Sequence, residues 1–395
     1  MELSELAALL TPEGLRLLDA MPPVDSSDDV ARAVTRLRRD GHSPDLVSAV
    51  VGQARLRTRA RAKFGDLAER MLFTRAGLEQ ATRLPIAARH AARFRDAGFA
   101  HVADLGCGIG GDALGLAGLG LRVTAVDADE VTAGIAAYNL APFGADAEVR
   151  LGAAEAADLD GVDAVWLDPA RRTAGHSETS RTRSEDWSPS LDWVLDLAKR
   201  MPVGVKLGPG LDRELIPDDV EAQWVSADGS TIELVLWSGA LARPGVRRAA
   251  LVIRGDQAHE LTAETDAADQ PTRDLGAFLH EPDGAVIRAR LIGDVARSLE
   301  AGMLDEHIAY LTSDAALTSP FVSTFRVRGV LPADEKALAK ALRERDIGRL
   351  EIKKRGVDVD PAALRTRLKL RGPESATLLL TRIGSRRTAI LADRV

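Results

Sequence analysis

Apolar residues recur at helical spacing through the first quarter of the chain. Leu46 and Val50 share one helix face, as do Leu67 and Met71, and the pattern predicts an N-terminal helical domain over residues 1–98. Within this domain the stretch RLRTRARAKF spreads basic residues around a helix. It indicates either a solvated helix surface or a contact with nucleic acid.

From residue 100 the pattern changes to short apolar runs that alternate with helical segments. This alternation predicts a doubly wound α/β sheet of mainly parallel strands over residues 99–240. The dipeptide Asp228-Gly229 separates the last two runs and is typical of a hairpin turn, so we expect the sheet to close with an antiparallel pair. The predicted strands are 102–105, 122–126, 148–151, 164–167, 203–207, 222–226 and 233–237.

The remaining chain divides into two further predicted parts. Residues 241–320 contain a strand-like run, RRAALVIRG, and a helix, AVIRARLIGDVARSLEAG, and we expect them to form a small satellite subdomain. Residues 321–395 read strand, helix, strand, helix and a hairpin that turns at Gly384-Ser385, with Pro361 opening the second helix. This order predicts a compact α+β domain.

Composition limits the classes of protein and site that fit. The chain has 395 residues, 45% hydrophobic and 28% charged, which is enough apolar sequence to bury several cores. No apolar run reaches the roughly 18 residues of a membrane span, and the acidic N-terminus does not resemble a signal peptide. The single cysteine, Cys107, fits a reducing cytoplasm and has no histidine nearby, so it is expected to be a packing residue. The scattered histidines predict no metal site.

Charge is distributed unevenly along the chain. The net charge is −7, yet residues 321–395 carry 18 Lys and Arg against 9 Asp and Glu, a net of +9, which leaves −16 for the remainder. The asymmetry predicts a basic partner-binding domain on an acidic body, although a merely solvated basic face has the same composition. Few aromatic residues accompany these charges, which favours structured RNA over stacked single strands as the partner.

The first predicted strand of the sheet runs into a glycine-rich loop, GCGIGGD, that opens a helix. Gly106, Gly108 and Gly110 permit positive φ angles and let the backbone approach a ligand closely. The next strand ends at Asp127, whose carboxylate can accept hydrogen bonds from both hydroxyls of a ribose. Such a loop binds either the pyrophosphate of a dinucleotide or the amino-acid end of S-adenosylmethionine, and these features do not separate the two.

The fourth predicted strand does separate them. It ends at Asp168-Pro169, at the edge where the active crevice of a parallel sheet opens. Dinucleotide enzymes have no general need for Asp-Pro at this place, and no catalytic His, Tyr or Lys motif accompanies the loop, so an oxidoreductase is disfavoured. Enzymes that methylate nitrogen often carry this pair.

The chain resembles the class I S-adenosylmethionine-dependent methyltransferases over roughly residues 70–240. The resemblance is carried by DLGCGIGGD, AVDAD and LDPAR. FTRAGLEQAT resembles the lead-in of the trimethylguanosine synthase group, whose threonine maps onto Thr82. GRLEIKKRGVDVDPAALRTRLKLRG is similar to the THUMP-like domain attached to a bacterial family of methyltransferases.

This resemblance implies a Rossmann-like sheet, an N-terminal helical domain, a C-terminal THUMP-like domain and S-adenosylmethionine as the cofactor. Ala153 stands where many members have an aspartate near the adenine, so Glu155 is expected to take that role. The residues that the resemblance places around the cofactor are Thr82, Asp104, Gly106, Gly108, Gly110, Asp127, Ala128, Glu155 and Asp168.

The acceptor side departs from the family pattern. Amino-methylating members usually read Asp/Asn-Pro-Pro-aromatic, where the ring stacks on a flipped base; here Ala170 and Arg171 replace the second proline and the ring. As the catalytic residues we expect Asp168 to accept a hydrogen bond from the acceptor amine, Pro169 to stiffen the turn, and Arg171 to stack on the substrate or pair with its phosphate.

Arg172 is predicted to bind substrate beside Arg171. The alternative is that both arginines pair with Glu178 or Glu185 and brace the loop.

Further substrate contacts are predicted at the crevice and in the basic domain. Trp187 either supplies the missing stacking surface or anchors its loop, and Lys206, near the end of the fifth strand, either contacts substrate or is structural. Lys353, Lys354 and Arg355 are predicted to bind phosphate.

These observations favour an S-adenosylmethionine-dependent methyltransferase that modifies a base nitrogen of structured RNA, either tRNA or rRNA. Two alternatives stay open. One is a methyltransferase for an acidic small molecule or a protein, with the basic domain serving assembly, and the other is a non-catalytic RNA-binding protein that retains the cofactor fold. We expect a cytoplasmic enzyme without a metal or membrane partner, and the sequence predicts no oligomeric state.

Overall fold

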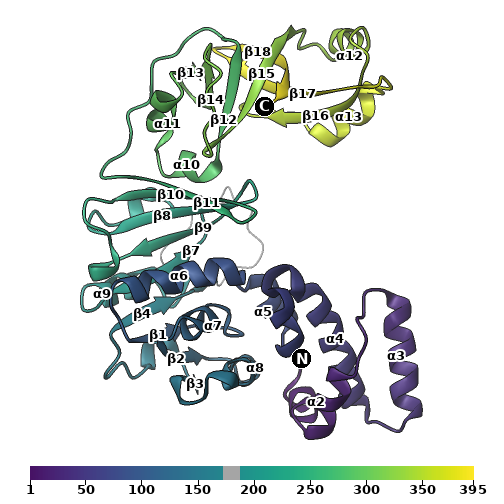
Figure 1. Ribbon diagram of the computed structural model, residues 1–395, viewed down its shortest axis with the longest axis vertical. Helices are drawn as coiled ribbons and strands as arrows, with labels where there is room; N and C mark the ends of the chain where they lie inside the picture. Colours follow the sequence, from purple (N-terminus) through teal and green to yellow (C-terminus); the bar gives the residue numbers. More distant parts are fainter. Residues whose placement is uncertain (172–186) are drawn as a thin grey trace. The chain divides into compact units, whose positions relative to one another are not determined.

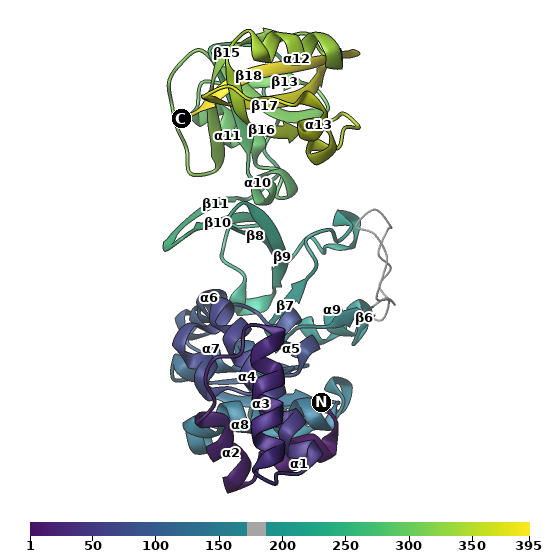
Figure 2. The same ribbon diagram turned by 90° about the vertical axis from the view of Figure 1, so that its right-hand side faces the viewer.

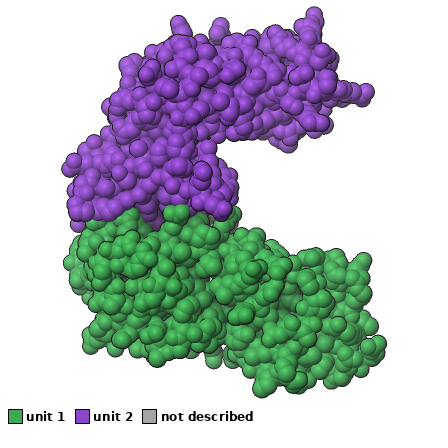
Figure 3. All heavy atoms as spheres, in the orientation of Figure 1, with its two compact units in different colours: residues 1–207, 212–215, 236–242 green, residues 208–211, 216–235, 243–395 purple. Residues whose placement is uncertain are grey.

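The computed structural model describes residues 1–171 and 187–395. Arg172, Glu178 and Glu185 lie outside the described residues, and so do the side chains of Ala170 and Arg171. The chain divides into two compact units (Figure 3). Unit 1 comprises residues 1–207, 212–215 and 236–242, and unit 2 comprises residues 208–211, 216–235 and 243–395.

The N-terminal region of unit 1 is helical, as predicted. Its elements are α1 (Leu3–Leu9), α2 (Pro12–Asp19), α3 (Ser27–Arg39), α4 (Pro44–Phe64), the 3₁₀ helix η1 (Gly65–Arg70), α5 (Arg75–Gln80) and α6 (Leu84–Asp96). The hydroxyls of Thr11, Ser26, Ser43 and Thr74 accept hydrogen bonds from first-turn N–H groups and so begin four of these helices. α4 packs against α1, α2 and α3 (Figure 2).

A parallel sheet with intervening helices follows in unit 1. Its strands are β1 (His101–Leu105), β2 (Arg122–Asp127), β3 (Ala147–Leu151), β4 (Ala164–Leu167) and β7 (Val203–Leu207), with helices α7 (Gly111–Gly118), α8 (Glu130–Leu140) and α9 (Leu191–Ala198). The strands lie in the order β7-β4-β1-β2-β3 (Figure 1). Leu105 pairs with both Val126 and Leu167 in parallel register, so β1, β2 and β4 end at the same edge. Short connecting elements are η2 (Ala141–Asp146), η3 (Ala154–Ala156), β5 (Ala170–Arg171), β6 (Trp187–Ser188), η5 (Arg213–Leu215) and η6 (Gly239–Leu241).

An aromatic cluster fills the core of unit 1 beside β4. The rings of His90, Phe94, Trp166 and Trp237 lie with centroids 4.4 to 6.3 Å apart. A Cβ at Gly204 of β7 would lie 2.7 Å from Trp237 and 2.9 Å from Trp166. Because residue 204 is a glycine, β7 packs closely against both indoles. This packing fixes the end of β7, which carries Lys206, one of the predicted substrate contacts.

Unit 2 begins with strands that pair in both parallel and antiparallel directions. They are β8 (Glu221–Ala227), the greater part of β9 (Ser230–Trp237), β10 (Arg248–Arg254) and β11 (Gln257–Ala263), in the order β11-β10-β8-β9. Asp228 and Gly229, with φ angles of 50° and 82°, form the predicted turn between β8 and β9. β10 pairs parallel with β8, so the first part of the predicted satellite, residues 241–320, belongs to this group of strands.

A second sheet in unit 2 combines the rest of that segment with the THUMP-like region (Figure 1). The elements are β12 (Phe278–Pro282), α10 (Gly284–Arg288), α11 (Ile292–Ser298), β13 (Gly302–Asp305), β14 (Ile308–Ser313), β15 (Val322–Leu331), α12 (Glu335–Arg343), β16 (Ile347–Lys354), α13 (Pro361–Leu368), β17 (Glu374–Ile383) and β18 (Arg386–Arg394). The strand order is β13-β14-β12-β15-β18-β17-β16. Two helices replace the single one expected after residue 283, because Arg290 adopts a φ of 60° between them.

The order strand, helix, strand, helix, hairpin predicted for residues 321–395 is observed in β15 to β18. α12 and α13 bury Leu342 and Leu368 against one face of the sheet, together with Leu378. Phe325 and Tyr310 lie in a separate apolar cluster. β16 lies at the end of the strand order, and Arg365 of α13 donates from Nε to the carbonyl oxygen of Leu350 at 3.2 Å.

Candidate active site

The glycine-rich loop joins β1 to α7 at the carboxyl edge of the parallel sheet. Gly106, Gly108 and Gly110 have φ angles of 81°, 57° and 85°, in the left-handed region that favours glycine. The N–H groups of Gly106 and Cys107 both donate to the carbonyl oxygen of Val126, at 2.8 and 3.0 Å. These contacts hold the loop against β2, so it forms a fixed turn at the strand ends.

Asp127 closes β2 with its carboxylate turned toward this loop. Its Oδ2 accepts from the N–H of Gly108 and its Oδ1 from the N–H of Asp129, each at 2.9 Å. Burial raises the pKa of Asp127, and these hydrogen bonds oppose the rise. The two hydrogen bonds fix the orientation of the Asp127 side chain. Because each carboxylate oxygen can accept two hydrogen bonds, Asp127 can still accept from hydroxyl groups of a ligand. Ala128 and Glu155, the other residues predicted on this side, are exposed.

Asp104 on β1 is a buried acceptor beside the loop. It is 1% exposed, and its Oδ2 has no hydrogen-bond partner within the part of the chain that the structure describes. Burial raises the pKa of Asp104 well above its usual value; the charges of Asp112 and Asp168 add to this rise, whereas Lys206 opposes it. An unmatched buried acceptor costs about 1–3 kcal/mol, so this position suits a ligand group that brings an N–H donor.

Buried polar side chains hold residues 71–73, which link η1 to α5. Gln53 donates to the carbonyl of Phe73 at 2.6 Å and accepts from its N–H at 3.0 Å. Arg57 donates to the carbonyl of Met71 at 2.9 Å and is 8% exposed. The expectation that the arginines of this basic stretch spread over the surface is therefore wrong for Arg57, because it lies on the buried face of α4.

Asn139 of α8 connects the same segment to the glycine loop. It accepts from the N–H of Leu72 at 2.8 Å and donates to the carbonyls of Leu72 and Ile109, at 3.0 and 2.9 Å. α5 then packs directly on the loop, since a Cβ on Gly77 would lie 2.4 Å from Ile109 Cγ2. Side-chain hydrogen bonds and packing, and not the backbone pairing of a strand, therefore hold residues 71–80 over the loop.

Lys63, at the end of the basic stretch, also faces protein backbone. Its ammonium donates three hydrogen bonds, at 2.7 to 2.8 Å, to carbonyl oxygens at the end of α5. Burial, followed by the charge of Lys206, lowers the pKa of Lys63. The contact fixes the residues immediately before Thr82. Sequence reasoning did not select Gln53, Asn139 or Lys63 for this purpose; the available signal was a polar residue on an otherwise apolar helix face.

A chain of hydrogen bonds links the end of β4 to the interior of unit 1. Lys206 Nζ lies 2.5 Å from Asp168 Oδ2 and donates to Thr82 Oγ1 at 2.9 Å. Thr82 donates to Asp112 Oδ2 at 2.7 Å, and His90 Nδ1 lies 2.8 Å from Asp112 Oδ1. The structure therefore brings together Thr82, Lys206 and Asp168, three residues that were selected from separate motifs.

Asp112 provides a buried negative charge in this chain. Burial raises the pKa of its carboxyl, but the hydrogen bond and charge of His90, with the charge of Lys206, lower that pKa to about 2. His90 in turn stacks on Trp166, with ring centroids 4.4 Å apart. His90 and Asp112 were not predicted as functional residues. Asp112 closes the glycine motif, which was the one local signal for it.

The other residues predicted on the acceptor side have different environments. Pro169 is buried after β4, and Arg171 lies in β5, which pairs with Trp187 of β6. Trp187 is 2% exposed, which favours its anchoring role over stacking on a substrate. The side chain of Arg171 and all of Arg172 lie outside the described residues, so their roles stay predictions.

Burial raises the pKa of the Cys107 thiol well above its usual value, which fits a packing residue.

The three basic residues predicted in β16 and after it also differ from one another. Lys353 Nζ lies 2.6 Å from Glu281 Oε2. The Arg355 guanidinium lies over the ring of Tyr310, 5.3 Å from its centroid. Lys354 is exposed and has no carboxylate partner among residues 1–171 and 187–395. Lys354 is therefore the one of the three whose charge faces solvent.

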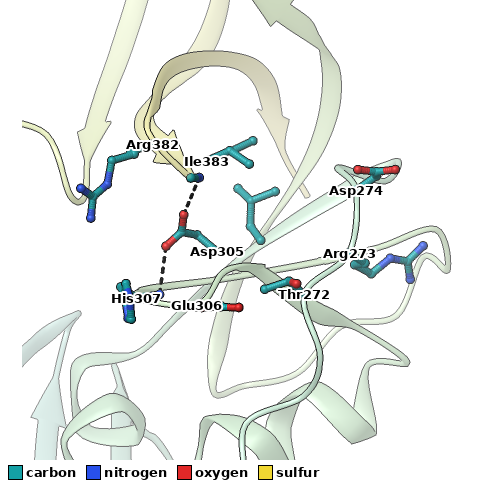
Figure 4. A pocket seen from close by; sticks show the side chains of 10 residues that line it. Thr272, Arg273, Asp274, Asp305, Glu306, His307, Arg382 and Ile383 are labelled. Atoms are coloured by element: carbon teal, nitrogen blue, oxygen red, sulfur yellow. Dashed lines mark hydrogen bonds between the residues drawn. The ribbon is translucent and has the colours of Figure 1, made fainter.

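Unit 2 contains a pocket of about 710 Å³ between the β13–β14 turn and the β17–β18 hairpin (Figure 4). Asp305 joins the two, because its Oδ2 accepts from the N–H of Gly384 at 2.7 Å and its Oδ1 from the N–H of His307 at 2.9 Å. Charged side chains of both signs line the pocket, among them Arg382 and Glu306, and none of the predicted site residues does. The strand ends of unit 1 are therefore the candidate active site.

Metal ligation and membrane insertion find no support within the described ranges, 1–171 and 187–395. No group of three or more His, Cys, Asp or Glu there is placed to hold a metal ion. No helix in the same ranges has the length and apolar character needed to cross a membrane.

Known proteins share this architecture. Two S-adenosylmethionine-dependent methyltransferases, described as uncharacterized and from two strains of Mycobacterium tuberculosis, are each 36% identical to the chain over 359 residues, covering 89% of this chain and 96% of the relative. A crystal structure from Porphyromonas gingivalis, designated a methyltransferase, shares the fold at a TM-score of 0.71 and 21% identity, covering 94% of this chain and 99% of that one.

Two family models match parts of the chain. One, described as THUMP domain-like, matches residues 322–394, and one described as a domain of unknown function matches residues 2–60. Identity of 36% over nearly the whole length of the relatives shows the family. The chain belongs to the S-adenosylmethionine-dependent methyltransferases, uses S-adenosylmethionine as its cofactor and carries a THUMP-like domain.

Proposed function

We propose that this methyltransferase modifies a base nitrogen of structured RNA, with tRNA and rRNA as the two classes to test. The proposal rests on the exposed basic side chains of residues 321–395 that have no carboxylate partner among the described residues. They are Arg326, Lys336, Arg343, Arg345, Arg349, Lys354, Arg365, Lys369, Arg371, Arg382, Arg386 and Arg387. The other six pair with acidic residues: Arg328, Lys340, Lys353, Arg355, Arg367 and Arg394.

The placement of these charges suits a large polyanion. Arg382, Arg386 and Arg387 lie at the tip of the β17–β18 hairpin, whereas Arg343 and Lys369 lie at the C-terminal ends of α12 and α13. Charges at separate places on one domain can contact several phosphates at once, whereas a small acid needs a single convergent site. Each phosphate contact adds affinity without regard to base sequence and weakens as salt increases.

The aromatic residues of the domain support structured RNA over single strands. Phe325 is fully buried in the sheet, and Phe321 is partly buried. Neither offers the exposed ring on which an unpaired base would stack. Recognition of shape and phosphate, as in double-stranded RNA, needs no such ring.

The strand ends of unit 1 fit S-adenosylmethionine. Asp104, with its unmatched Oδ2, would accept an N–H of the cofactor's amino group, and Asp127 would accept the ribose hydroxyls. Gly108 leaves the backbone open beside them, since nothing lies within 4 Å of where its Cβ would be, and exposed Glu155 would lie toward the adenine. The bound cofactor supplies an electrophilic methyl group on a sulfonium sulfur.

Asp168 is the residue that would hold the acceptor. Its carboxylate would accept an N–H of the acceptor amine and direct the nitrogen lone pair along the line of transfer. The N–C bond forms as the C–S bond breaks to leave a neutral thioether, and the nitrogen gives up its proton to the carboxylate or to water. Pro169 stiffens the turn, and Arg171 and Arg172 hold the base or its phosphate. Positioning of this kind supplies up to about 7–11 kcal/mol of the barrier reduction, so no strong acid or base is required.

The test uses the full-length enzyme, tritiated S-adenosylmethionine and total RNA from a strain that lacks the gene. We expect label in one RNA size class at low salt, less label as salt rises, and little label with Asp168→Asn. Equilibrium binding of S-adenosylmethionine to both proteins is measured in parallel. Intact cofactor binding without label in RNA would overturn the proposal. The same assay is run on the protein and small-molecule fractions of that strain, and label there in place of RNA would support the alternative substrates.

A further inference from the structure

The hydrogen-bonded chain between Asp168 and His90 begins and ends at the same strand. Asp168 follows β4, and the His90 ring packs on Trp166 of β4 at an interplanar angle of 30°. Between these ends the chain passes through Asp112 of α7, Thr82 before α6 and Lys206 of β7. It therefore ties α6, α7 and β7 to β4 beside the strand-end carboxylate.

The direction of these hydrogen bonds follows from the chemistry of Thr82. Its hydroxyl has one hydrogen, which goes to Asp112, because an ionised carboxylate only accepts. The pKa of Asp112 is about 2, so this carboxyl is ionised at neutral pH. Thr82 Oγ1 then accepts from Lys206 at 2.9 Å. Lys206 consequently donates both to Thr82 and to Asp168.

Two acceptors fix a side chain that is otherwise flexible. A lysine carries its ammonium on a four-carbon stem with several rotatable bonds, yet the Lys206 side chain is only 12% exposed. Its Nζ lies 2.5 Å from Asp168 Oδ2, so the position of the ammonium sets the orientation of the carboxylate. Such precision matters, because a misplacement of about 1 Å can reduce a rate by about 100-fold.

We propose that Thr82, Asp112 and His90 are positioning residues, which hold Lys206 against Asp168 and so orient the carboxylate that receives the acceptor amine. The proposal rests on the acceptor-binding role proposed for Asp168. Thr82 bridges the ammonium to the buried charge, Asp112 supplies that charge, and His90 holds Asp112. The three are 7%, 6% and 4% exposed, so they act through Lys206 without touching a macromolecular substrate.

The first experiment compares three variants of the full-length enzyme. Thr82→Val keeps the volume and removes the bridging hydroxyl, and we expect kcat to fall by about 10- to 100-fold while KM for RNA changes by less than about 3-fold. Thr82→Ser keeps the hydroxyl and restores most of kcat. Thr124→Val is the matched control, because Thr124 is 5% exposed in the same sheet and its hydroxyl lies 2.9 Å from His101 Nε2.

A double-mutant cycle separates positioning from general support of the fold. If Thr82 acts through Lys206, Thr82→Val lowers kcat by less than about 2-fold in a Lys206→Met background. An equal loss of kcat in both backgrounds would show that Thr82 acts independently of Lys206 and would overturn the proposal.

A third measurement does not depend on the RNA substrate. A lysine ammonium held by two acceptors exchanges its protons slowly and gives an observable nuclear magnetic resonance signal, which is assigned to Lys206 by its loss in Lys206→Met. We expect this signal in wild type and Thr82→Ser and its disappearance in Thr82→Val. A signal that is absent from wild type, or unchanged in Thr82→Val, would overturn the positioning role even if RNA is the substrate. Failure to label RNA while the signal behaves as expected would overturn only the proposed substrate.

Discussion

Two basic residues on the inner side of α4 and two on a hairpin of the THUMP-like domain have the same chemistry and different surroundings. Arg57 donates from Nε to the Met71 carbonyl and pairs with Asp19 through Nη1, and Lys63 donates to three carbonyls at the end of α5. Arg386 and Arg387, on the β17–β18 hairpin, are exposed and have no carboxylate partner in the described ranges. A positive charge in the first group stabilises a turn, whereas one in the second is available to a polyanion.

The difference teaches that burial, not the density of charge in the sequence, decides what a basic run does. The buried positions of α4 include Val50, Ala54 and Arg57, spaced by four and three residues, and this spacing continues to Phe64. Arg57 therefore lies on the apolar face, where its donors have to find acceptors within the protein. The hairpin arginines have no such constraint.

The largest effect on stability is expected from substitution of Arg57, which is compared with Arg59 on the exposed side of α4. Arg57→Met removes both the donor to the Met71 carbonyl and the ion pair with Asp19, and we expect the free energy of unfolding to fall by about 2–3 kcal/mol. Arg59→Met, on the exposed side of the same helix, should change it by less than about 0.5 kcal/mol. Urea denaturation followed by circular dichroism measures both, and equal effects would remove the distinction between the two surroundings.

A second prediction concerns acid stability. The pKa of Asp112 is about 2 in the fold against 3.8 for an unperturbed aspartate, so its stabilisation is complete above about pH 4 and is lost as pH falls through 2. The stabilisation amounts to about 2 kcal/mol. Asp112→Asn removes this titration, so unfolding stability should fall less between pH 4 and pH 2 than in wild type. An unchanged pH dependence would show that Asp112 is not the group responsible.

The exposed charges provide the third prediction. Arg386→Gln with Arg387→Gln should weaken binding of the labelled RNA class by about 10-fold at low salt and reduce the slope of log affinity against log salt by about 2. Thermal stability should not change. Arg328→Gln is the control, because Arg328 pairs with Asp393 on the same domain. A loss of affinity as large in the control would mean that net charge, and not the exposed hairpin, governs binding.

The smallest effect is expected within one basic run. Lys353→Met breaks a partly buried pair with Glu281 and should lower stability by about 0.5–1 kcal/mol with little change in RNA affinity. Lys354→Gln should do the reverse, since its side chain is exposed. Filter binding and thermal denaturation on the two variants give the comparison, and the opposite assignment of effects would show that Lys353 contacts RNA.

Much of the fold of unit 1 and of its candidate active site is predictable from local sequence pattern. The strands of the parallel sheet, the glycine loop and the Asp127 and Asp168 strand ends follow from short apolar runs and the residues that end them. The parallel pairing of β10 with β8 cannot be predicted from local pattern, because strand order depends on contacts between distant segments. The contact between His90 and Asp112, which are 22 residues apart, was missed for the same reason.

Unusual backbone conformations at single residues also limited what the sequence could predict. Residues 284–300 have continuous helical character in sequence, yet Arg290 takes a left-handed φ and separates two short helices. Such a conformation is unusual for a residue other than glycine, so no propensity rule anticipates it. The roles of Arg171 and Arg172 stay predictions.

The outer strand of the THUMP-like domain bears on how the protein behaves at high concentration. β16 ends the strand order, four of its eight residues are charged, and Arg365 already occupies the Leu350 carbonyl. Charged side chains on an edge strand disfavour the addition of a strand from another molecule. Arg349, Lys354 and Arg365, which contribute to the positive surface of the domain, therefore also protect its outer strand from edge-to-edge aggregation.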